Sequence, residues 1–538
     1  MPSLQAKYPP ADAAPAPVPT TQHPQLTFTM KEVEKAARRF RKGSAPGPSG
    51  WRPEHLLAAL QSAPGRKDRV LQALTALVNT LVGGGVAPEA APYFCGARLH
   101  AAAKKDGGIL PIAVGNLLRR LVSKCCTTRL QGRAAALFAP HQLGVGVRGG
   151  CEAIIHTVRK TLASDPSLLL CQADYLNAFN LASREKGLDE VARVFPEILA
   201  WVSTCYGQPS ILLYGALTIL SERGWHQGDP LSGLLFCLVL LPLITTIKER
   251  VPTMALQAWF LDDGTFLGRK EDLVQVIDIL VAEGPARGRV LSTTLTSPAS
   301  PKTTVWCPAG PLEPPPAALA ARGLVFVGEE GVTLLGAPLG SREFVEEEVE
   351  KVVSKVAVVT ERLQQLEDPH TEFVLQRSCY SLPKFSFILR TVDTTGMMPL
   401  LRRFDTVTRD GLARILGTTL DDRAWHQAKL PVSKGGMGMK AAEDHALWPT
   451  LPASSPPSRS PTPSRVSIRR RRWRRGRRGK PTRPRPSPTT CWQPCWPPWA
   501  RKWWRQTWWG CPSGSWEPRW TTDRGGCWRR GWGRRRWR

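Results

Sequence analysis

Two adjacent aspartates lie at the centre of an apolar stretch that runs from Ala255 to Leu267. The aliphatic and aromatic residues on both sides, with Asp262-Asp263-Gly264 as the turn, predict a β-hairpin. An Asp-Gly turn is common without any ligand, so this segment alone does not establish a functional site. However, two like charges side by side repel each other, and carboxylate oxygens favour a hard cation such as Mg²⁺. The hairpin therefore indicates a metal site if another carboxylate joins it.

A third carboxylate follows a second apolar strand upstream. The segment from Leu168 to Ala173 is apolar apart from one glutamine, and Asp174 comes directly after it. If this strand brings Asp174 to the same sheet edge as Asp262 and Asp263, the three carboxylates form a cluster able to hold two metal ions. Two ions about 3.5–4 Å apart can activate an attacking hydroxyl and stabilise a leaving oxygen in phosphoryl transfer.

A glycine-containing loop lies between the two predicted strands. It runs from Gln227 to Leu231 and precedes an apolar segment, Leu234 to Ile244, which we expect to be helical. Gly228 would let the backbone approach a ligand closely, and the glutamine before it offers an amide. The bulky side chains of Trp225 and His226 come directly before the loop. Their size predicts crowding beside it.

These three segments, in this order and spacing, resemble the palm of a reverse transcriptase of the non-LTR (LINE-type) retrotransposon family. Asp174 to Phe179 is similar to the first metal-binding motif of that family. Gln227 to Leu231 is similar to its template and nucleotide motif, and Phe260 to Asp263 is similar to its paired-aspartate motif. Three motifs in order make a specific signal, and the resemblance extends over residues 30–445.

The resemblance implies an RNA-directed DNA polymerase that extends a primer 3′-hydroxyl with dNTPs by a two-metal mechanism. Asp174, Asp262 and Asp263 would be the catalytic and metal-binding residues, with Mg²⁺ as the cofactor and Mn²⁺ as a substitute for it. The implied partners are an RNA template, a DNA or RNA primer and dNTPs, and the sequence indicates no particular protein partner. An RNA-dependent RNA polymerase is an alternative, because its palm has the same carboxylate layout.

Four further residues would contact the substrates if the same matching holds. Phe179 would be the bulky side chain beneath the sugar that excludes a 2′-hydroxyl, which favours deoxynucleotides and argues against the RNA polymerase. Gln227 and Gly228 would contact the template and the nucleotide. Lys302 resembles the family's lysine near the departing pyrophosphate. The structural alternatives are a core aromatic for Phe179 and an ordinary surface position for Lys302.

A second hairpin is predicted from Arg98 to Val114, and it resembles the fingers hairpin of the family. Lys104 and Lys105 lie at its turn, where two cations on a Gly-rich tip would either meet a triphosphate or remain solvated. The family usually has an arginine where this chain has Leu110, and leucine cannot donate a hydrogen bond to phosphate. The alternative function is therefore a catalytically impaired relic that binds nucleic acid without synthesis.

The resemblance implies an α+β chain with a right-hand polymerase fold, in which the palm has an antiparallel sheet with packed helices. About 400 structured residues exceed the size at which one core suffices, which agrees with several subdomains. Valines at helical spacing predict that a helical thumb begins with the segment Phe344 to Leu366. The expected divisions are a disordered Pro/Ala-rich leader (1–29), the fingers (30–165), the palm with part of the fingers (166–343), the thumb and its flanking segment (344–446), and a disordered tail (447–538).

The tail differs in composition from the rest of the chain. Residues 449–538 contain 24 Lys plus Arg against two acids, a net charge of +22 out of +29 for the whole chain. After Ile468 they contain no Leu, Ile, Val, Met, Phe or Tyr, which predicts disorder. Arginine and tryptophan together could clamp nucleic acid, and the four cysteines could bind zinc. We favour a third interpretation, out-of-frame translation in a truncated or frameshifted copy, because Arg, Pro, Gly and Trp have GC-rich codons.

No segment predicts export or insertion into a membrane. The N-terminus lacks a charged-then-apolar signal pattern, and the longest apolar run is too short to span a bilayer. Apart from the Cys125-Cys126 pair, the cysteines outside the tail are scattered singly, which predicts reduced thiols. We therefore expect a soluble intracellular protein, with no preference between cytoplasm and nucleus.

Overall fold

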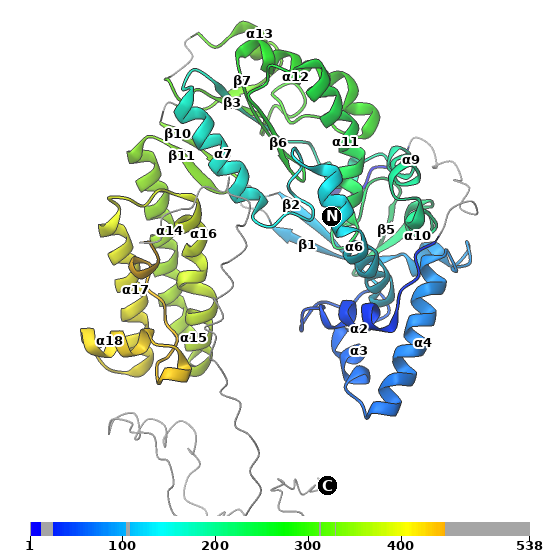
Figure 1. Cartoon of the computed structure of the whole chain (residues 1–538), viewed down its shortest axis with the longest axis horizontal. Coiled ribbons are helices and arrows are strands. Elements are labelled where there is room, and N and C mark those ends of the chain that lie inside the picture. Colours follow the sequence, from blue (N-terminus) through cyan, green and yellow to red (C-terminus); the bar gives the residue numbers. More distant parts are fainter. Residues whose placement is uncertain (1, 12–24, 104–107, 311–313, 329, 447–538) are drawn as a thin grey trace, which may run out of the picture. The chain divides into compact units, whose positions relative to one another are not determined.

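The computed structural model describes residues 2–11, 25–103, 108–310, 314–328 and 330–446 (Figure 1). The C-terminal tail, residues 12–24 of the expected leader, and the hairpin tip with Lys104 and Lys105 lie outside the described residues. Helices and largely antiparallel sheets are mixed along the described part of the chain, which confirms the α+β class.

The two strands expected to deliver carboxylates belong to one five-stranded sheet. Its strand order is β6-β7-β3-β8-β9. The strands are β3 (Leu169–Ala173), β6 (Leu256–Phe260), β7 (Asp263–Gly268), β8 (Thr304–Trp306) and β9 (Val325–Phe326). All neighbours are antiparallel except β8 and β9, which are parallel. Strand β7 therefore lies between β6 and β3, and the two motifs meet across it.

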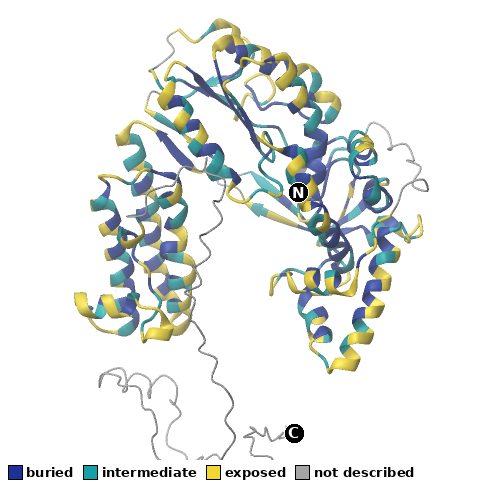
Figure 2. Cartoon of the chain, viewed as in Figure 1, coloured by how far each residue is buried: buried dark blue, intermediate teal, exposed yellow. Residues whose placement is uncertain are grey.

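Both faces of this sheet are buried (Figure 2). Alternate residues of β3 belong to different hydrophobic clusters, since Leu169 and Cys171 pack into one and Leu170 packs into the other. The first cluster includes residues of α11 (Ser232–Arg250) and α12 (Lys270–Glu283). The second includes residues of α7 (Gly150–Ser164) and of the hairpin formed by β10 (Gly331–Leu334) and β11 (Ala337–Gly340). Burial on both faces explains why the strand is a continuous apolar run.

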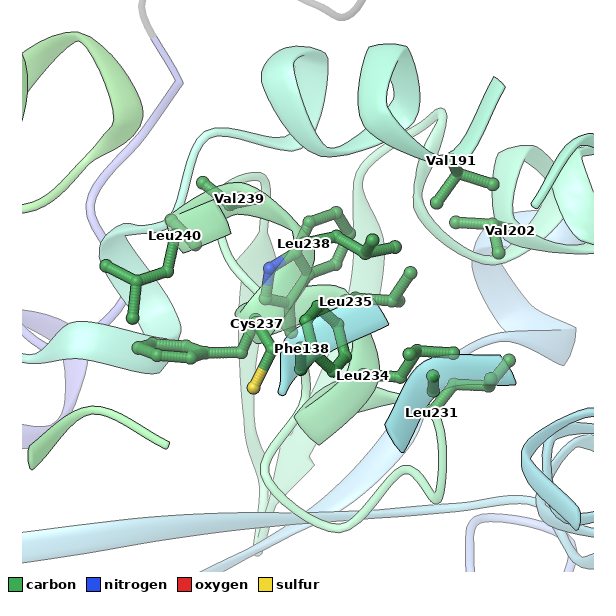
Figure 3. Close-up of a cluster of buried hydrophobic side chains, with 14 of the residues drawn as sticks. Phe138, Val191, Val202, Leu231, Leu234, Leu235, Cys237, Leu238, Val239 and Leu240 are labelled. Atoms are coloured by element: carbon green, nitrogen blue, oxygen red, sulfur yellow. The ribbon is translucent and has the colours of Figure 1, made fainter. Parts of the chain in front are cut away.

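Helix α11 is the central helix of the larger cluster. Figure 3 shows its side chains clustered around Phe138, at the end of α6 (Leu117–Phe138), with Val191 of α9 (Arg184–Val194) and Val202 of α10 (Leu199–Tyr206) to one side. Every residue from Leu234 to Leu240 is at most 2% exposed. Among the described residues, α11 is the one helix that is long and apolar enough to cross a membrane. Its burial in this core accounts for that composition.

A four-stranded sheet contains the second predicted hairpin. Its order is β2-β1-β4-β5, and its strands are β1 (Ala97–Ala103), β2 (Ile109–Gly115), β4 (Ser210–Tyr214) and β5 (Leu217–Ser221). Strands β1 and β2 pair antiparallel, as the sequence predicts, whereas β1 and β4 pair in parallel over two residues.

The expectation of a disordered leader is wrong for residues 2–11. Helix α1 (Pro2–Gln5) is followed by a turn, and Leu4 and Tyr8 are buried against apolar residues of the four-stranded sheet. The carbonyl of Lys7 also accepts a 2.8 Å hydrogen bond from Asn177 Nδ2. Two large apolar side chains within a polar segment were enough to anchor it, although composition alone predicts disorder.

Most of the remaining helices form two groups. The N-terminal group consists of α2 (Met30–Arg38), α3 (Pro53–Leu60), α4 (Pro64–Val82) and α5 (Ala91–Phe94). The C-terminal group consists of α14 (Arg342–Arg362), α15 (Pro369–Leu375), α16 (Leu382–Thr391), α17 (Met398–Leu416), α18 (Asp422–Lys429) and α19 (Glu443–Ala446). In α14 the residues Val349, Val353 and Val356 are buried, which confirms the helical periodicity read from the sequence.

Candidate active site

The two-residue turn of the β6–β7 hairpin carries the paired aspartates. Phe260 pairs with Asp263 across the hairpin, so Leu261 and Asp262 form the turn and Asp263 already begins β7. This differs from the expected Asp-Asp-Gly turn by one residue. Leu261 has a φ of +56°, a left-handed conformation that a bulky residue rarely adopts. A left-handed first residue is a feature of the tight turns that match the twist of a hairpin.

Asp174 comes to the same end of the sheet as these two aspartates. The antiparallel register pairs Ala173 with Gly264, so Asp174, the next residue, comes opposite Asp263. Opposed residues of antiparallel strands have Cα atoms about 4.5–5.5 Å apart. The register therefore gathers Asp174, Asp262 and Asp263 at one sheet edge, although Asp174 lies far from the other two in the sequence.

The negative charges of Asp174 and Asp262 disfavour ionisation of Asp263. Burial, followed by the charges of Asp262 and Asp174, raises the pKa of Asp263 to about 7. In the described part of the chain, no three His, Cys, Asp or Glu side chains are grouped closely enough to hold a metal ion as they stand. The donor set nevertheless fits a hard divalent cation, because its ligands are oxygens and a cation would offset their mutual repulsion.

Asp174 and Asp263 line a pocket of about 380 Å³ together with Lys302. Ser292 links these residues, because its N–H donates to the Asp174 carbonyl at 2.8 Å and its carbonyl accepts from Lys302 N at 3.1 Å. The other lining residues come from the sheet and from the β10–β11 hairpin: Gln172, Ala173, Gly264, Thr265, Thr304, Val327, Val332, Thr333, Leu334 and Leu335. The pocket thus combines two carboxylates, one cation and several hydroxyls at the sheet edge.

Phe179 lies on the short helix α8 (Ala178–Leu181), which follows Asn177 in a left-handed conformation. Its ring stacks on that of Phe236 of α11, with centroids 4.5 Å apart and an interplanar angle of 25°. Phe179 is only partly buried, so part of the ring packs on the core and part remains accessible. The core contact expected in the structural alternative is present, and it also fixes the position of the ring.

Arg289 lies beneath this aromatic pair and is missing from the residues proposed from the sequence. It is fully buried, its guanidinium carbon is 3.8 Å from the Phe236 ring centroid, and its Nη1 donates to the Ala178 carbonyl at 2.7 Å. Burial lowers its pKa to about 10, and the charges of Tyr175 and Asp262 partly oppose this shift. Arg289 is therefore a buried cation close to the aspartate edge. Nothing local in the sequence distinguishes it from a surface arginine.

The loop from Gln227 to Leu231 lies directly on strand β2. The Gln227 carbonyl accepts a 2.8 Å hydrogen bond from Ala113 N. Gly228 has a φ of +131°, and a Cβ atom at that position would lie 2.5 Å from the Ala113 carbonyl oxygen. Only glycine fits this close approach without movement of the backbone.

The expectation that Trp225 and His226 crowd this loop is wrong. The two side chains are 1% and 2% exposed and lie in the interior. The Trp225 ring meets Tyr206 edge-on, with centroids 5.0 Å apart, and Gly187 of α9 leaves the space that the indole occupies. The two side chains therefore pack in the interior under the loop and do not crowd it.

A buried polar network holds the same loop. Arg119 of α6 forms an ion pair with Asp229 at 2.9 Å, and Tyr206 donates to the same carboxylate oxygen at 3.0 Å. His226 Nδ1 is 3.0 Å from Arg119 Nη1, and its Nε2 lies 3.1 Å from the hydroxyls of Ser210 and Ser221. Burial, helped by the charges of Arg119 and Arg184, holds the His226 pKa well below its usual value. The ring is therefore neutral.

Leu110 lies near the start of β2, two residues before Ile112. Strand residues alternate between faces, so Leu110 shares a face with Ile112. A Cβ atom on Gly228 would come 3.7 Å from Ile112 Cγ2. Leu110 is half-buried, and its side chain cannot supply the hydrogen bonds of the arginine expected there.

Comparison with known proteins identifies one clear relative in sequence. The chain is 28% identical, over an alignment of 442 residues that covers 78% of this chain, to the retrotransposable element SLACS 132 kDa protein of Trypanosoma brucei gambiense. The chain spans about a third of the length of that relative, since the match covers 34% of it. The resemblance to a retrotransposon protein, which the motifs predict, is confirmed by this match.

Other comparisons are weaker. No family model matches the chain. Among solved structures, the chain is similar to apo telomerase from Candida tropicalis truncated from its C-terminal domain, with 15% identity and a TM-score of 0.30. That similarity covers 37% of this chain and 49% of the telomerase chain.

Proposed function

We propose that the chain is an RNA-directed DNA polymerase, or reverse transcriptase, that extends a primer 3′-hydroxyl with dNTPs on an RNA template. The similarity to a retrotransposon protein supports a reverse transcriptase-type function in general terms. The observation that carries the proposal is the pairing of β3 with β7, which gathers Asp174, Asp262 and Asp263 at one sheet edge beside Lys302.

In this proposal the three aspartates hold two Mg²⁺ ions, or Mn²⁺ in their place. Such ions, when bound, lower the pKa of the primer hydroxyl and neutralise charge on the departing pyrophosphate. Asp174 and Asp262 carry most of the binding, and Asp263 adds a third carboxylate. Lys302, in the same pocket, meets the phosphates of the nucleotide. Lys104 and Lys105, which lie outside the described residues, would meet the triphosphate in this proposal.

Phe179 and the Gln227–Leu231 loop position the nucleotide in the same proposal. The Phe179 ring, fixed by its stacking on Phe236, lies beneath the sugar and excludes a 2′-hydroxyl. Gln227 and Gly228, in the loop that lies on β2, contact the template and the nucleotide. Primer extension with rNTPs in place of dNTPs tests this step, because Phe179→Ala should raise ribonucleotide incorporation relative to deoxynucleotide incorporation.

Primer extension on poly(rA)/oligo(dT) by the full chain tests the proposal directly. We expect Asp174→Asn and Asp262→Asn to lower the rate by orders of magnitude, since each removes a charge that the transition state requires. Asp410→Asn, at an exposed position on α17, is the matched control and should leave the rate unchanged. Unchanged extension by either active-site variant would remove that aspartate from the site.

Leu110 favours a second candidate function, a retroelement relic that binds nucleic acid without synthesis. In that case the parent chain would bind the primer–template duplex but incorporate no nucleotide with either Mg²⁺ or Mn²⁺. Binding measured by fluorescence anisotropy, beside extension of the same duplex, separates the two functions. An RNA polymerase would instead extend the primer with rNTPs in preference to dNTPs.

A further inference from the structure

The turn that carries Asp262 has an unfavourable backbone conformation at Leu261. Its φ of +56° lies in the left-handed region, which glycine, asparagine and aspartate adopt far more readily than leucine. Unfavourable conformations of this kind persist only where the surrounding structure fixes them. Some contact outside the hairpin must therefore hold the turn.

Gln142 provides that contact with both ends of its carboxamide. Its Nε2 donates to the Leu261 carbonyl at 2.9 Å, and its Oε1 accepts from Leu261 N, also at 2.9 Å. The same oxygen accepts from Gly144 N at 2.9 Å. Gln142 is 0% exposed, so no water competes for these bonds. One side chain thus satisfies both backbone polar groups of the left-handed residue.

The segment around Gln142 is itself fixed to strand β6. Trp259 N donates to the His141 carbonyl at 2.6 Å, and Leu143 N donates to the Trp259 carbonyl at 2.8 Å. These bonds form a parallel β-bridge between Gln142 and Trp259. A Cβ atom on Gly144 would lie 2.5 Å from Leu261 N, so this glycine permits the segment to lie against the turn. Gln142 therefore extends from a rigid support.

We infer that Gln142 is a positioning residue that holds Leu261 in its left-handed conformation and so orients Asp262 and Asp263 toward Asp174. The role of these aspartates as metal ligands rests on the proposed function. The hydrogen bonds themselves do not depend on it. A misplacement of about 1 Å at a catalytic group can lower a rate by about 10²-fold, so a side chain that touches no substrate can still control turnover.

The inference predicts a specific energetic coupling between Gln142 and Leu261. Gln142→Leu removes both hydrogen bonds, whereas Leu261→Gly makes the left-handed conformation intrinsically accessible. If Gln142 acts by holding this conformation, Gln142→Leu should be much less harmful when Leu261→Gly is also present. If Gln142 only fills space in the core, the two effects should multiply.

The test measures four quantities for the full-length parent, both single variants and the double variant: kcat, the KM for dTTP, Mn²⁺ affinity by titration calorimetry, and Tm. We expect Gln142→Leu to lower kcat by about 10²-fold and to weaken Mn²⁺ binding, with an unchanged KM for dTTP. In the double variant, we expect Leu261→Gly to restore most of the lost kcat and most of the lost Mn²⁺ affinity. Gln142→Asn keeps a shorter amide and serves as the conservative variant if Gln142→Leu does not fold.

Gln257→Leu is the matched control, because Gln257, on β6, is also a buried glutamine, but its side chain donates to the Ile244 carbonyl at 3.2 Å and not to Leu261. Gln257→Leu should lower Tm about as much as Gln142→Leu does, and it should leave Mn²⁺ affinity unchanged. Multiplying effects in the double variant, or equal Mn²⁺ affinity in the parent and Gln142→Leu, would overturn the inference. If the parent incorporates no dTTP, the polymerase proposal fails separately, and the Mn²⁺ titrations still decide the role of Gln142.

Discussion

Arg119 and Asp229 form an ion pair with 2.9 Å between Nη2 and Oδ2, and their side chains are only 1% and 3% exposed. They join α6 to the loop that begins at Gln227, across 110 residues of sequence. Tyr206 donates to the same oxygen of Asp229. Because removing a charge from water costs several kcal/mol, each partner is tolerated in the interior only while the other is present.

Asp229→Asn should therefore destabilise the chain strongly. The amide keeps the shape of the carboxylate but leaves the Arg119 charge buried without compensation, which costs about 3–5 kcal/mol. Urea denaturation of the parent and the variant measures this difference. The exposed pair of Arg322 and Asp278 provides the control, because Asp278→Asn should cost only about 0–1 kcal/mol. Equal losses of unfolding free energy in the two variants would show that Asp229 does not form a buried ion pair with Arg119.

Gly228→Ala should disturb the same loop by a steric effect. The added Cβ would meet the Ala113 carbonyl oxygen at 2.5 Å, and the φ of +131° is unfavourable for alanine. A backbone position of this kind costs about 1–3 kcal/mol when a side chain is forced into it. We expect a lower Tm and reduced primer extension. Gly65→Ala on α4 is the control, because a Cβ there meets no atom within 4 Å, and a Tm loss matching that of Gly228→Ala would contradict the steric argument.

The apolar pattern was sufficient to predict the elements that carry the aspartates. Strand β3, the β6–β7 hairpin and helix α11 all appear where continuous apolar runs end at turns or polar residues. The meeting of Asp174 with Asp263 was an expectation of the family resemblance, and the register of β3 against β7 brings the two residues opposite each other. The exact turn residues did not follow from the sequence pattern, because the choice of Leu261 and Asp262 as the turn depends on the hydrogen bonds from Gln142.

Residues whose roles depend on tertiary contacts could not be predicted. Arg289 lies among apolar side chains beneath Phe236, and its sequence neighbours do not indicate burial. Trp225 and His226 were expected to crowd the loop, but the indole of Trp225 fills the space left by Gly187, and His226 Nε2 lies beside the hydroxyls of Ser210 and Ser221 in the interior. Packing between residues that are far apart in the sequence determines where these side chains lie, and a local sequence pattern carries no information about such packing.

Asp263 should make the stability of the metal-free chain dependent on pH. Its pKa is raised to about 7 in the folded chain, against about 3.9 in the unfolded chain. The folded state thus holds a proton that the unfolded state releases. The stabilising contribution is complete below about pH 4 and is lost as the pH rises through about 7. Asp263 remains partly open to solvent, so screening makes the effect smaller than the shift alone implies.

Asp263→Asn should remove the loss of stability that the metal-free chain shows as the pH rises. We expect the variant to have a higher Tm than the parent at pH 8 without divalent ions, and a similar Tm at pH 4.5. Mg²⁺ should raise the Tm of the parent more at pH 8 than at pH 5, because it binds the ionised carboxylates. A Tm difference between parent and variant that is the same at both pH values would contradict the shifted pKa.

Leu110→Arg should improve nucleotide binding if the chain is a polymerase that lacks one phosphate contact. Leu110 shares a face of β2 with Ile112, which a Cβ atom on Gly228 would contact, so an arginine at position 110 could reach toward the nucleotide from the strand. A hydrogen bond to a charged group contributes about 1.5–3 kcal/mol, and 1.4 kcal/mol corresponds to a tenfold change in binding. We therefore expect the KM for dTTP to fall roughly tenfold or more. Leu110→Met is the control of similar size without charge and should leave KM unchanged, and an unchanged KM in Leu110→Arg itself would show that position 110 does not face the triphosphate.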